Sequence, residues 1–162
     1  MRYRRPYPSG ALVFLTLVTH RRAACLCEDP VRLALSRAAA HVRARHPFHT
    51  VAYVVLPDHC HLLWQLPDDA ADYSLRVRLI KHHMARQPGL PNPLWQKRFW
   101  EHQIRDEGDM QMHMDYIHFN PVRHGYVGKA REWPDSSFHH HVERGRYDRE
   151  WGLSESIDLS GE

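Results

Sequence analysis

Two apolar runs joined by a two-residue turn restrict the fold of this chain more than any other feature. Residues 49–56 read His-Thr-Val-Ala-Tyr-Val-Val-Leu, residues 59–66 read His-Cys-His-Leu-Leu-Trp-Gln-Leu, and Pro57-Asp58 separates them. Runs rich in β-branched, aliphatic and aromatic residues favour strands, and the short connection predicts an antiparallel hairpin. Other elements must then cover the apolar faces of this hairpin.

The segments on either side of the hairpin alternate between strand and helix patterns. In chain order we expect a strand at 11–19, then a helix with Asp29 as its N-cap and Pro30 as its first residue, which ends at His46-Pro47. The hairpin, a helix at 74–86 and a strand at 99–105 follow. This order is that of a ferredoxin-like α+β fold, an antiparallel sheet with helices on one face. An extra C-terminal helix at 109–119 carries Tyr116 and is predicted to stop at Asn120-Pro121.

The length and composition are those of one soluble domain. The chain has 162 residues, of which 43% are hydrophobic and 25% charged, enough to bury a core without disulfides or metals. Few apolar residues follow Glu143. We therefore expect the segment after Glu143 to pack loosely and to act as a regulatory tail that competes with DNA. Residues 1–150 are expected to form the domain and residues 151–162 a mobile, acidic and Ser-rich end.

Cysteine usage and the longest apolar run near the N-terminus indicate a cytoplasmic protein without a membrane partner. Cys25, Cys27 and Cys60 are odd in number and have neither disulfide nor zinc-finger spacing. The run from Ala11 to Val18 is much shorter than a membrane span.

The positive charge is modest in total but clustered, and this pattern suits a polyanion. The net charge is +3, and basic residues gather near Arg4-Arg5, around Lys81 and at Lys97-Arg98. Solvated surface charge is the alternative explanation. The 15 histidines are a separate excess.

One pair of histidines has the spacing of metal ligands. His59 and His61 lie in a predicted strand, where alternate side chains share a face, so both imidazoles can bind one cation. Two imidazoles leave positions open for water or substrate, as a catalytic metal requires. Ordinary core or surface histidines remain the alternative. His82-His83 and His139 to His141 are discounted, the latter as solvated side chains in a polar segment.

A second pair lies on the last predicted helix. Tyr116 and Asn120 are four residues apart and can face the same neighbour. The Asn120 amide oxygen suits Mg²⁺ or Mn²⁺. Alone, the two residues could equally be a boundary tyrosine and a helix terminator.

Three longer motifs resemble those of the REP-associated tyrosine transposases. They are Val54-Val-Leu-Pro-Asp-His-Cys-His-Leu62, Trp95-Gln96 with Arg98-Phe-Trp-Glu-His102, and Asp115-Tyr-Ile-His-Phe-Asn-Pro-Val-Arg-His-Gly125. The resemblance extends from about Tyr3 to Tyr147, nearly the whole chain.

This resemblance implies an HUH single-strand DNA endonuclease in the bacterial cytoplasm, associated with the nucleoid. Tyr116 would attack DNA and form a 5′-phosphotyrosyl link that a 3′-hydroxyl can reverse. His59, His61 and Asn120 would hold a divalent metal ion, Mg²⁺ or Mn²⁺. A phenol is a weak acid, so attack by Tyr116 needs a group that accepts its proton.

The implied partners are single-stranded and hairpin DNA from palindromic repeats. We expect a monomer, as in the REP-associated branch, although related insertion-sequence transposases are dimers. The residues expected to contact phosphates are Arg4, Arg5, Lys81, Lys97, Arg98 and Arg123. The aromatic residues Tyr7, Trp95 and Trp100 could stack on unpaired bases, although core packing is the more common role.

Other functions remain open at this point. A histidine-triad hydrolase would need a third alternating histidine where the chain has Leu63. Relaxases and replication initiators share the chemistry but carry additional elements. A domesticated module could bind the DNA hairpin without cutting it.

Overall fold

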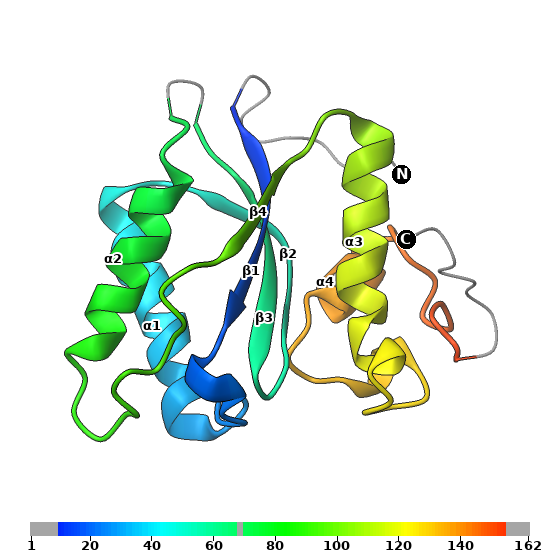
Figure 1. Cartoon of the computed structure of the whole chain (residues 1–162). Helices are drawn as coiled ribbons and strands as arrows, with labels where there is room; N and C mark the ends of the chain where they lie inside the picture. Colours follow the sequence, from blue (N-terminus) through cyan, green and yellow to red (C-terminus); the bar gives the residue numbers. More distant parts are fainter. Residues whose placement is uncertain (1–9, 68–69, 155–162) are drawn as a thin grey trace.

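The computed structural model of the protein describes residues 10–67 and 70–154 (Figure 1). This part contains a four-stranded antiparallel sheet with the strand order β2-β3-β1-β4. The strands are β1 Leu12–Val18, β2 His49–Val55, β3 His59–Gln65 and β4 Trp100–Gln103. The helices are α1 Asp29–Arg45, α2 Tyr73–Ala85, α3 Glu107–Arg123 and α4 Phe138–Glu143, with short 3-10 helices at His20–Arg22 and Ala130–Glu132.

Helices cover both faces of the sheet. Figure 1 shows α1 and α2 on one face, and α3 with α4 on the other. The element order β1-α1-β2-β3-α2-β4 and the central pairing of β1 with β3 confirm the ferredoxin-like prediction. The added helix, α3, confirms the predicted extra element and places Tyr116 over the face that α1 and α2 leave open.

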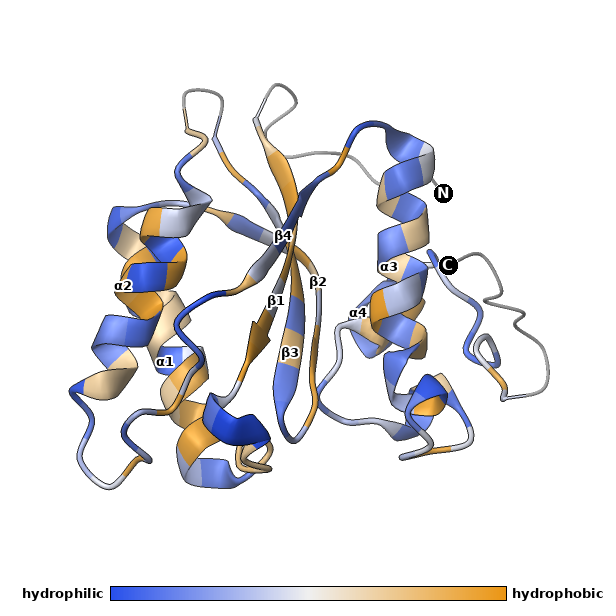
Figure 2. Cartoon of the chain, in the orientation of Figure 1, coloured by the Kyte–Doolittle hydropathy of each residue, from blue (hydrophilic) through white to orange (hydrophobic). Residues whose placement is uncertain are grey.

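Strand β1 is buried on both faces, which explains its nearly continuous hydrophobic sequence (Figure 2). Val13, Leu15 and Leu17 join the core under α1 and α2. Leu12 and Phe14 join the core under α3 with Met114 and other apolar residues of that helix. The two cores share one sheet, so the position of α3 depends on the same strand that anchors α1 and α2.

The boundaries of α3 differ from the prediction at both ends. The helix begins at Glu107 because the Asp106 side chain accepts a hydrogen bond of 2.7 Å from the Asp109 N–H and caps it. It continues through Pro121 instead of stopping there, and its end is set at Gly125, which has a φ of 78°. The Gly125 and Tyr126 N–H groups donate to the Val122 and Pro121 carbonyls, a Schellman motif. Asn120 therefore stays in helical register with Tyr116.

Two smaller boundaries also differ. The N-cap of α1 is Glu28, and Asp29 lies in the first turn of the helix instead of capping it. Strand β4 is only four residues long because its pairing with β1 ends at Gln103.

The chain after α3 covers the outer edge of β2. The Trp133 indole N–H donates to the Val55 carbonyl at 3.0 Å. The Ser137 hydroxyl accepts from the Tyr53 N–H at 2.8 Å. These bonds satisfy edge groups that would otherwise be open to pairing with another chain, and they tie α4 to the sheet.

The expectations of solvated histidines at 139–141 and of loose packing after Glu143 are wrong in part. His141 is only 1% exposed, and its Nε2 forms a 2.7 Å hydrogen bond with the Val51 carbonyl. Tyr147 is buried and donates a 2.6 Å hydrogen bond to Asp115, and Trp151 packs on Tyr147. Scattered aromatic residues provide this packing. The predicted tail lies largely outside the described residues, at 155–162.

None of the helices in the described ranges combines the length and hydrophobicity of a membrane span.

Candidate functional site

The predicted ligands His59 and His61 share the face of β3 that α3 covers. Both imidazoles are largely buried, and their ring centroids lie 5.0 Å apart. The register places Thr16 of β1 directly beside His61, and Trp100 of β4 directly beside Thr16. Because paired residues project on the same face, one row of side chains runs from His61 to the edge strand.

Each imidazole is oriented through its Nδ1 atom. The His59 Nδ1 lies 2.7 Å from the Asp58 carboxylate, and the His61 Nδ1 lies 2.7 Å from the Thr16 hydroxyl. These contacts leave the Nε2 atom of each ring as the available ligand atom. A carboxylate or other polar group behind the imidazole is the usual support of a metal-binding histidine.

Helix α3 brings Tyr116 and Asn120 to the same place. The Tyr116 ring centroid lies 5.3 Å from that of His61 and 6.0 Å from that of Phe14. Asn120, one turn later, is completely buried. The structure therefore brings together all four residues that the sequence predicted for the catalytic and metal sites.

Among the described residues, three buried polar atoms at this point have no hydrogen-bond partner: His61 Nε2, Asn120 Oδ1 and Asn120 Nδ2. Asn120 lies close enough to His61 to affect its pKa, although the two side chains do not form a hydrogen bond of good geometry. Buried polar atoms without partners are costly, and a cation bound by the nitrogen and the amide oxygen would satisfy two of them.

The protonation state of His61 also suits a ligand. Burial lowers its pKa to about 3, with further lowering from the nearby His59, His124 and Arg123. The imidazole is therefore neutral near neutral pH, as metal binding requires. The donor set fits a divalent cation.

The predicted phosphate contacts are spread over different parts of the molecule. The Arg123 guanidinium lies over the Tyr116 ring, 5.2 Å from its centroid. Lys97 and Arg98 are exposed just before β4. Lys81 donates a 2.9 Å hydrogen bond to the Gln96 carbonyl, so its ammonium already contacts the protein. Arg4 and Arg5 lie outside the described residues.

The tryptophans suggested for base stacking have different environments. Trp95 is buried in the core beneath α1 and α2. Trp100 is 67% exposed and stands at the open end of the row that includes Thr16 and His61. Of these two rings, that of Trp100 is the exposed one. Tyr7, the third candidate, lies outside the described residues.

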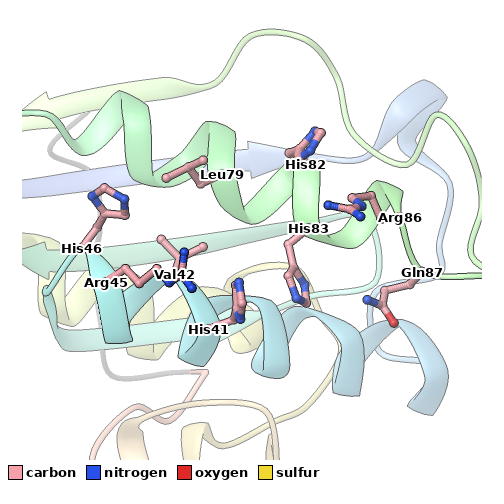
Figure 3. A pocket seen from close by; sticks show the side chains of 9 residues that line it. All are labelled: His41, Val42, Arg45, His46, Leu79, His82, His83, Arg86 and Gln87. Atoms are coloured by element: carbon pink, nitrogen blue, oxygen red, sulfur yellow. The ribbon is translucent and has the colours of Figure 1, made fainter.

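A cavity of about 490 Å³ lies between α1 and α2 (Figure 3). These two helices cover the face of the sheet opposite α3 (Figure 1). The lining of the cavity includes four histidines and two arginines but no carboxylate: His41, His46, His82, His83, Arg45 and Arg86. The rings of His41 and His83 lie 4.5 Å apart. Adjacent His82 and His83 point in different directions in Figure 3, which agrees with their rejection as a metal pair.

The relatives found by comparison with known proteins belong to one family. The chain is 42% identical to the REP-associated tyrosine transposase of Escherichia coli, over 92% of this chain and 89% of the relative. It is 38% identical to a Haemophilus influenzae protein assigned to the same group, over 99% of this chain and 98% of the relative. The chain belongs to the REP-associated tyrosine transposases. The family predicted from the motifs is confirmed.

A solved structure of a REP-associated tyrosine transposase bound to a REP hairpin has the same fold. It superposes with a TM-score of 0.83 at 40% identity, over 100% of this chain and 97% of that chain. A scan against models of protein families finds no match. The relatives' names place the chain among transposases, which are DNA-processing enzymes.

Sequence reasoning missed the residues that support the site of this REP-associated tyrosine transposase. Asp58 precedes His59 directly and could have been recognised as its partner. Thr16 becomes visible only when the β1-β3 register is known. His124, with its ring 5.2 Å from that of His59, follows Arg123 at the end of α3 and was not singled out.

Proposed function

We propose that this protein cleaves and rejoins single-stranded DNA at hairpin-forming palindromic repeats, with Tyr116 as the nucleophile. The observation that carries the proposal is the convergence of Tyr116 and Asn120 from α3 on the two imidazoles of β3. A nucleophile beside a buried, incompletely paired set of ligand atoms is the arrangement that metal-assisted phosphoryl transfer needs.

His59, His61 and Asn120 would hold a divalent cation, Mg²⁺ or Mn²⁺. When bound, the cation would supply positive charge that polarises the scissile phosphate. Asp58 and Thr16 keep the two imidazoles oriented with their Nε2 atoms available.

The Tyr116 side chain performs the substitution at phosphorus. Its hydroxyl oxygen forms a phosphotyrosyl ester on the 5′ side, and the bond from phosphorus to the 3′ oxygen breaks. The proton lost by Tyr116 is balanced by the proton gained on the departing 3′-hydroxyl. Because one ester replaces another, a 3′-hydroxyl can reverse the reaction without ATP. Arg123, over the Tyr116 ring, is positioned to neutralise phosphate charge at this point.

The DNA path that we propose follows the β4 side of this site. Lys97 and Arg98 contact phosphates, and Trp100 stacks on an unpaired base beside the row that leads to His61. Arg4 and Arg5 are additional phosphate contacts, with Lys81 in a lesser role because of its bond to Gln96.

Hairpin DNA is the proposed substrate because a solved relative is bound to a REP hairpin and shares the fold along the whole chain. A palindromic stem with a single-stranded extension would give the basic residues a duplex to hold and Tyr116 an accessible phosphate.

The test is a cleavage assay on a labelled hairpin oligonucleotide taken from the genomic neighbourhood of the gene. Wild type, Tyr116→Phe and the control Tyr126→Phe are compared with and without Mg²⁺ or Mn²⁺. Tyr126 is a half-exposed tyrosine just past the end of α3. We expect cleavage that requires the metal, is retained in Tyr126→Phe and is lost in Tyr116→Phe. Hairpin binding by wild type without any cleavage would instead establish a binding module.

A further inference from the structure

A second cluster of metal-ligating side chains lies between β4 and the first two turns of α3. It consists of His102, Asp109 and His113, whose ligand atoms all lie within 4.8 Å of one another. Over residues 10–67 and 70–154, this is the one group of three such side chains that could hold an ion. None of the three belongs to the site around Tyr116.

The distances within the cluster are close to those of a metal coordination sphere. The His102 Nε2 lies 2.9 Å from Asp109 Oδ2, and the His113 Nδ1 lies 3.2 Å from Asp109 Oδ1. Ligands about 2.0–2.1 Å from a tetrahedral Zn²⁺ are themselves separated by roughly 3.3 Å. Small movements of the side chains would let all three bind one cation.

The Asp109 carboxylate is buried and incompletely paired. Its side chain is 5% exposed, and Oδ1 has no hydrogen-bond partner in the part of the chain that the structure describes. The other oxygen, Oδ2, accepts a hydrogen bond from the Arg105 N–H and contacts His102. The His113 Nδ1 is directed at the Asp109 main-chain carbonyl at 2.8 Å and so does not satisfy Oδ1.

A bound cation would add positive charge beside the Asp109 carboxylate. A buried carboxylate requires nearby positive charge. The Arg105 guanidinium lies 3.8 Å from Oδ2, but its side chain is 79% exposed and contributes little. If His113 Nδ1 turned to a cation, the Asp109 carbonyl would still accept the main-chain N–H of the helix four residues later.

We propose that His102, Asp109 and His113 bind a transition-metal ion of the Zn²⁺ type and that this ion ties the edge strand β4 to the helix that carries Tyr116. Two imidazoles and one carboxylate are a zinc donor set, whereas Mg²⁺ prefers oxygen ligands. Phe14 separates this site from the first one, with its ring 4.8 Å from His113 and 5.4 Å from His61.

The position of β4 relative to α3 would then depend on a bound metal ion, separately from the metal proposed for cleavage. Strand β4 is four residues long and, within the described residues, pairs with β1 alone, so a cross-link to α3 would hold it in place. Trp100, the base-stacking candidate, is on the same strand.

The experiment measures binding of Co²⁺, a spectroscopic substitute for Zn²⁺, to the untagged full-length protein by visible absorption, with Zn²⁺ displacement as confirmation. The variants are His102→Gln, His113→Gln and, for the first site, His61→Gln. His82→Gln, on α2, is the matched control. We expect tetrahedral Co²⁺ bands in wild type, His61→Gln and His82→Gln, and a loss of affinity of about 100-fold in His102→Gln and His113→Gln.

A fifth variant protects the test against misfolding. His102 is partly exposed, so His102→Cys should fold and keep a zinc ligand, restoring Co²⁺ binding with an added thiolate absorption band. Tetrahedral bands that keep their wild-type intensity in both glutamine variants, or that disappear in His61→Gln, would overturn the proposal. Since no DNA is present, this outcome is independent of the cleavage assay.

Discussion

Replacing Thr16 with valine removes the hydrogen bond that orients His61 but keeps His61 itself, the proposed metal ligand. The Thr16 hydroxyl lies 2.7 Å from the Nδ1 of His61, which is 4% exposed. Valine puts a methyl group in place of the hydroxyl and leaves the imidazole without a partner on that side. A buried polar group without a partner costs about 1–3 kcal/mol. Losses of outer-shell partners lower metal affinity by about 10–100-fold, or roughly 1.4–2.7 kcal/mol, which is the same range.

The assay is calorimetric titration of Thr16→Val with Mn²⁺ in Zn²⁺-free buffer, alongside wild type and Thr50→Val. Thr50 is a strand threonine on β2, paired with Trp64 away from the two histidines. We expect weaker Mn²⁺ binding in Thr16→Val alone, with circular dichroism unchanged in both variants. A Thr16→Val protein that is folded and binds Mn²⁺ as tightly as wild type would refute the role given to this hydrogen bond.

Four further predictions concern stability and DNA binding. Burial lowers the pKa of His141 to about 4 from the ordinary value of 6.5. The free energy of unfolding should therefore fall by about 1.4 kcal/mol per pH unit between pH 6.5 and pH 4, because the unfolded chain takes up the proton first. Urea unfolding of His141→Gln should show a weaker dependence on pH in this range. Gly152→Ala should lower the free energy of unfolding by about 1–3 kcal/mol, because the φ of Gly152 is 84° and an added Cβ would lie 2.8 Å from another side chain. Trp100→Ala should weaken single-strand binding by about 1–3 kcal/mol in fluorescence anisotropy, whereas Trp100→Phe retains most of it. Lys97→Ala and Arg98→Ala should each reduce, by about 1, the slope of the logarithm of the hairpin binding constant against the logarithm of the salt concentration. An unchanged slope would remove that residue from the DNA path.

Local patterns in the sequence were sufficient to predict the strands, the main helices and the face on which His59, His61, Tyr116 and Asn120 meet. The alternation of side chains along a strand placed His59 and His61 together, and helical spacing placed Tyr116 with Asn120. The stop predicted at Pro121 was wrong, because losing one N–H in the last turn did not outweigh burial and the Schellman motif at Gly125.

Contacts that depend on strand register could not be predicted from sequence patterns. Thr16 meets His61 only because β1 pairs with β3, and His102 faces Asp109 only because β4 pairs with the other edge of β1. The buried state of His141 was missed for a related reason. Its partner, the Val51 carbonyl, comes from a strand 90 residues earlier.

The role of Tyr116 as nucleophile is tested most directly by identifying the residue that becomes covalently linked to DNA. Wild-type protein is incubated with the hairpin and Mn²⁺, trimmed with nuclease and analysed by peptide mass spectrometry. We expect a nucleotide linked through its 5′ phosphate to Tyr116. A nucleotide on any other residue, or cleaved DNA with no peptide adduct at all, would contradict it.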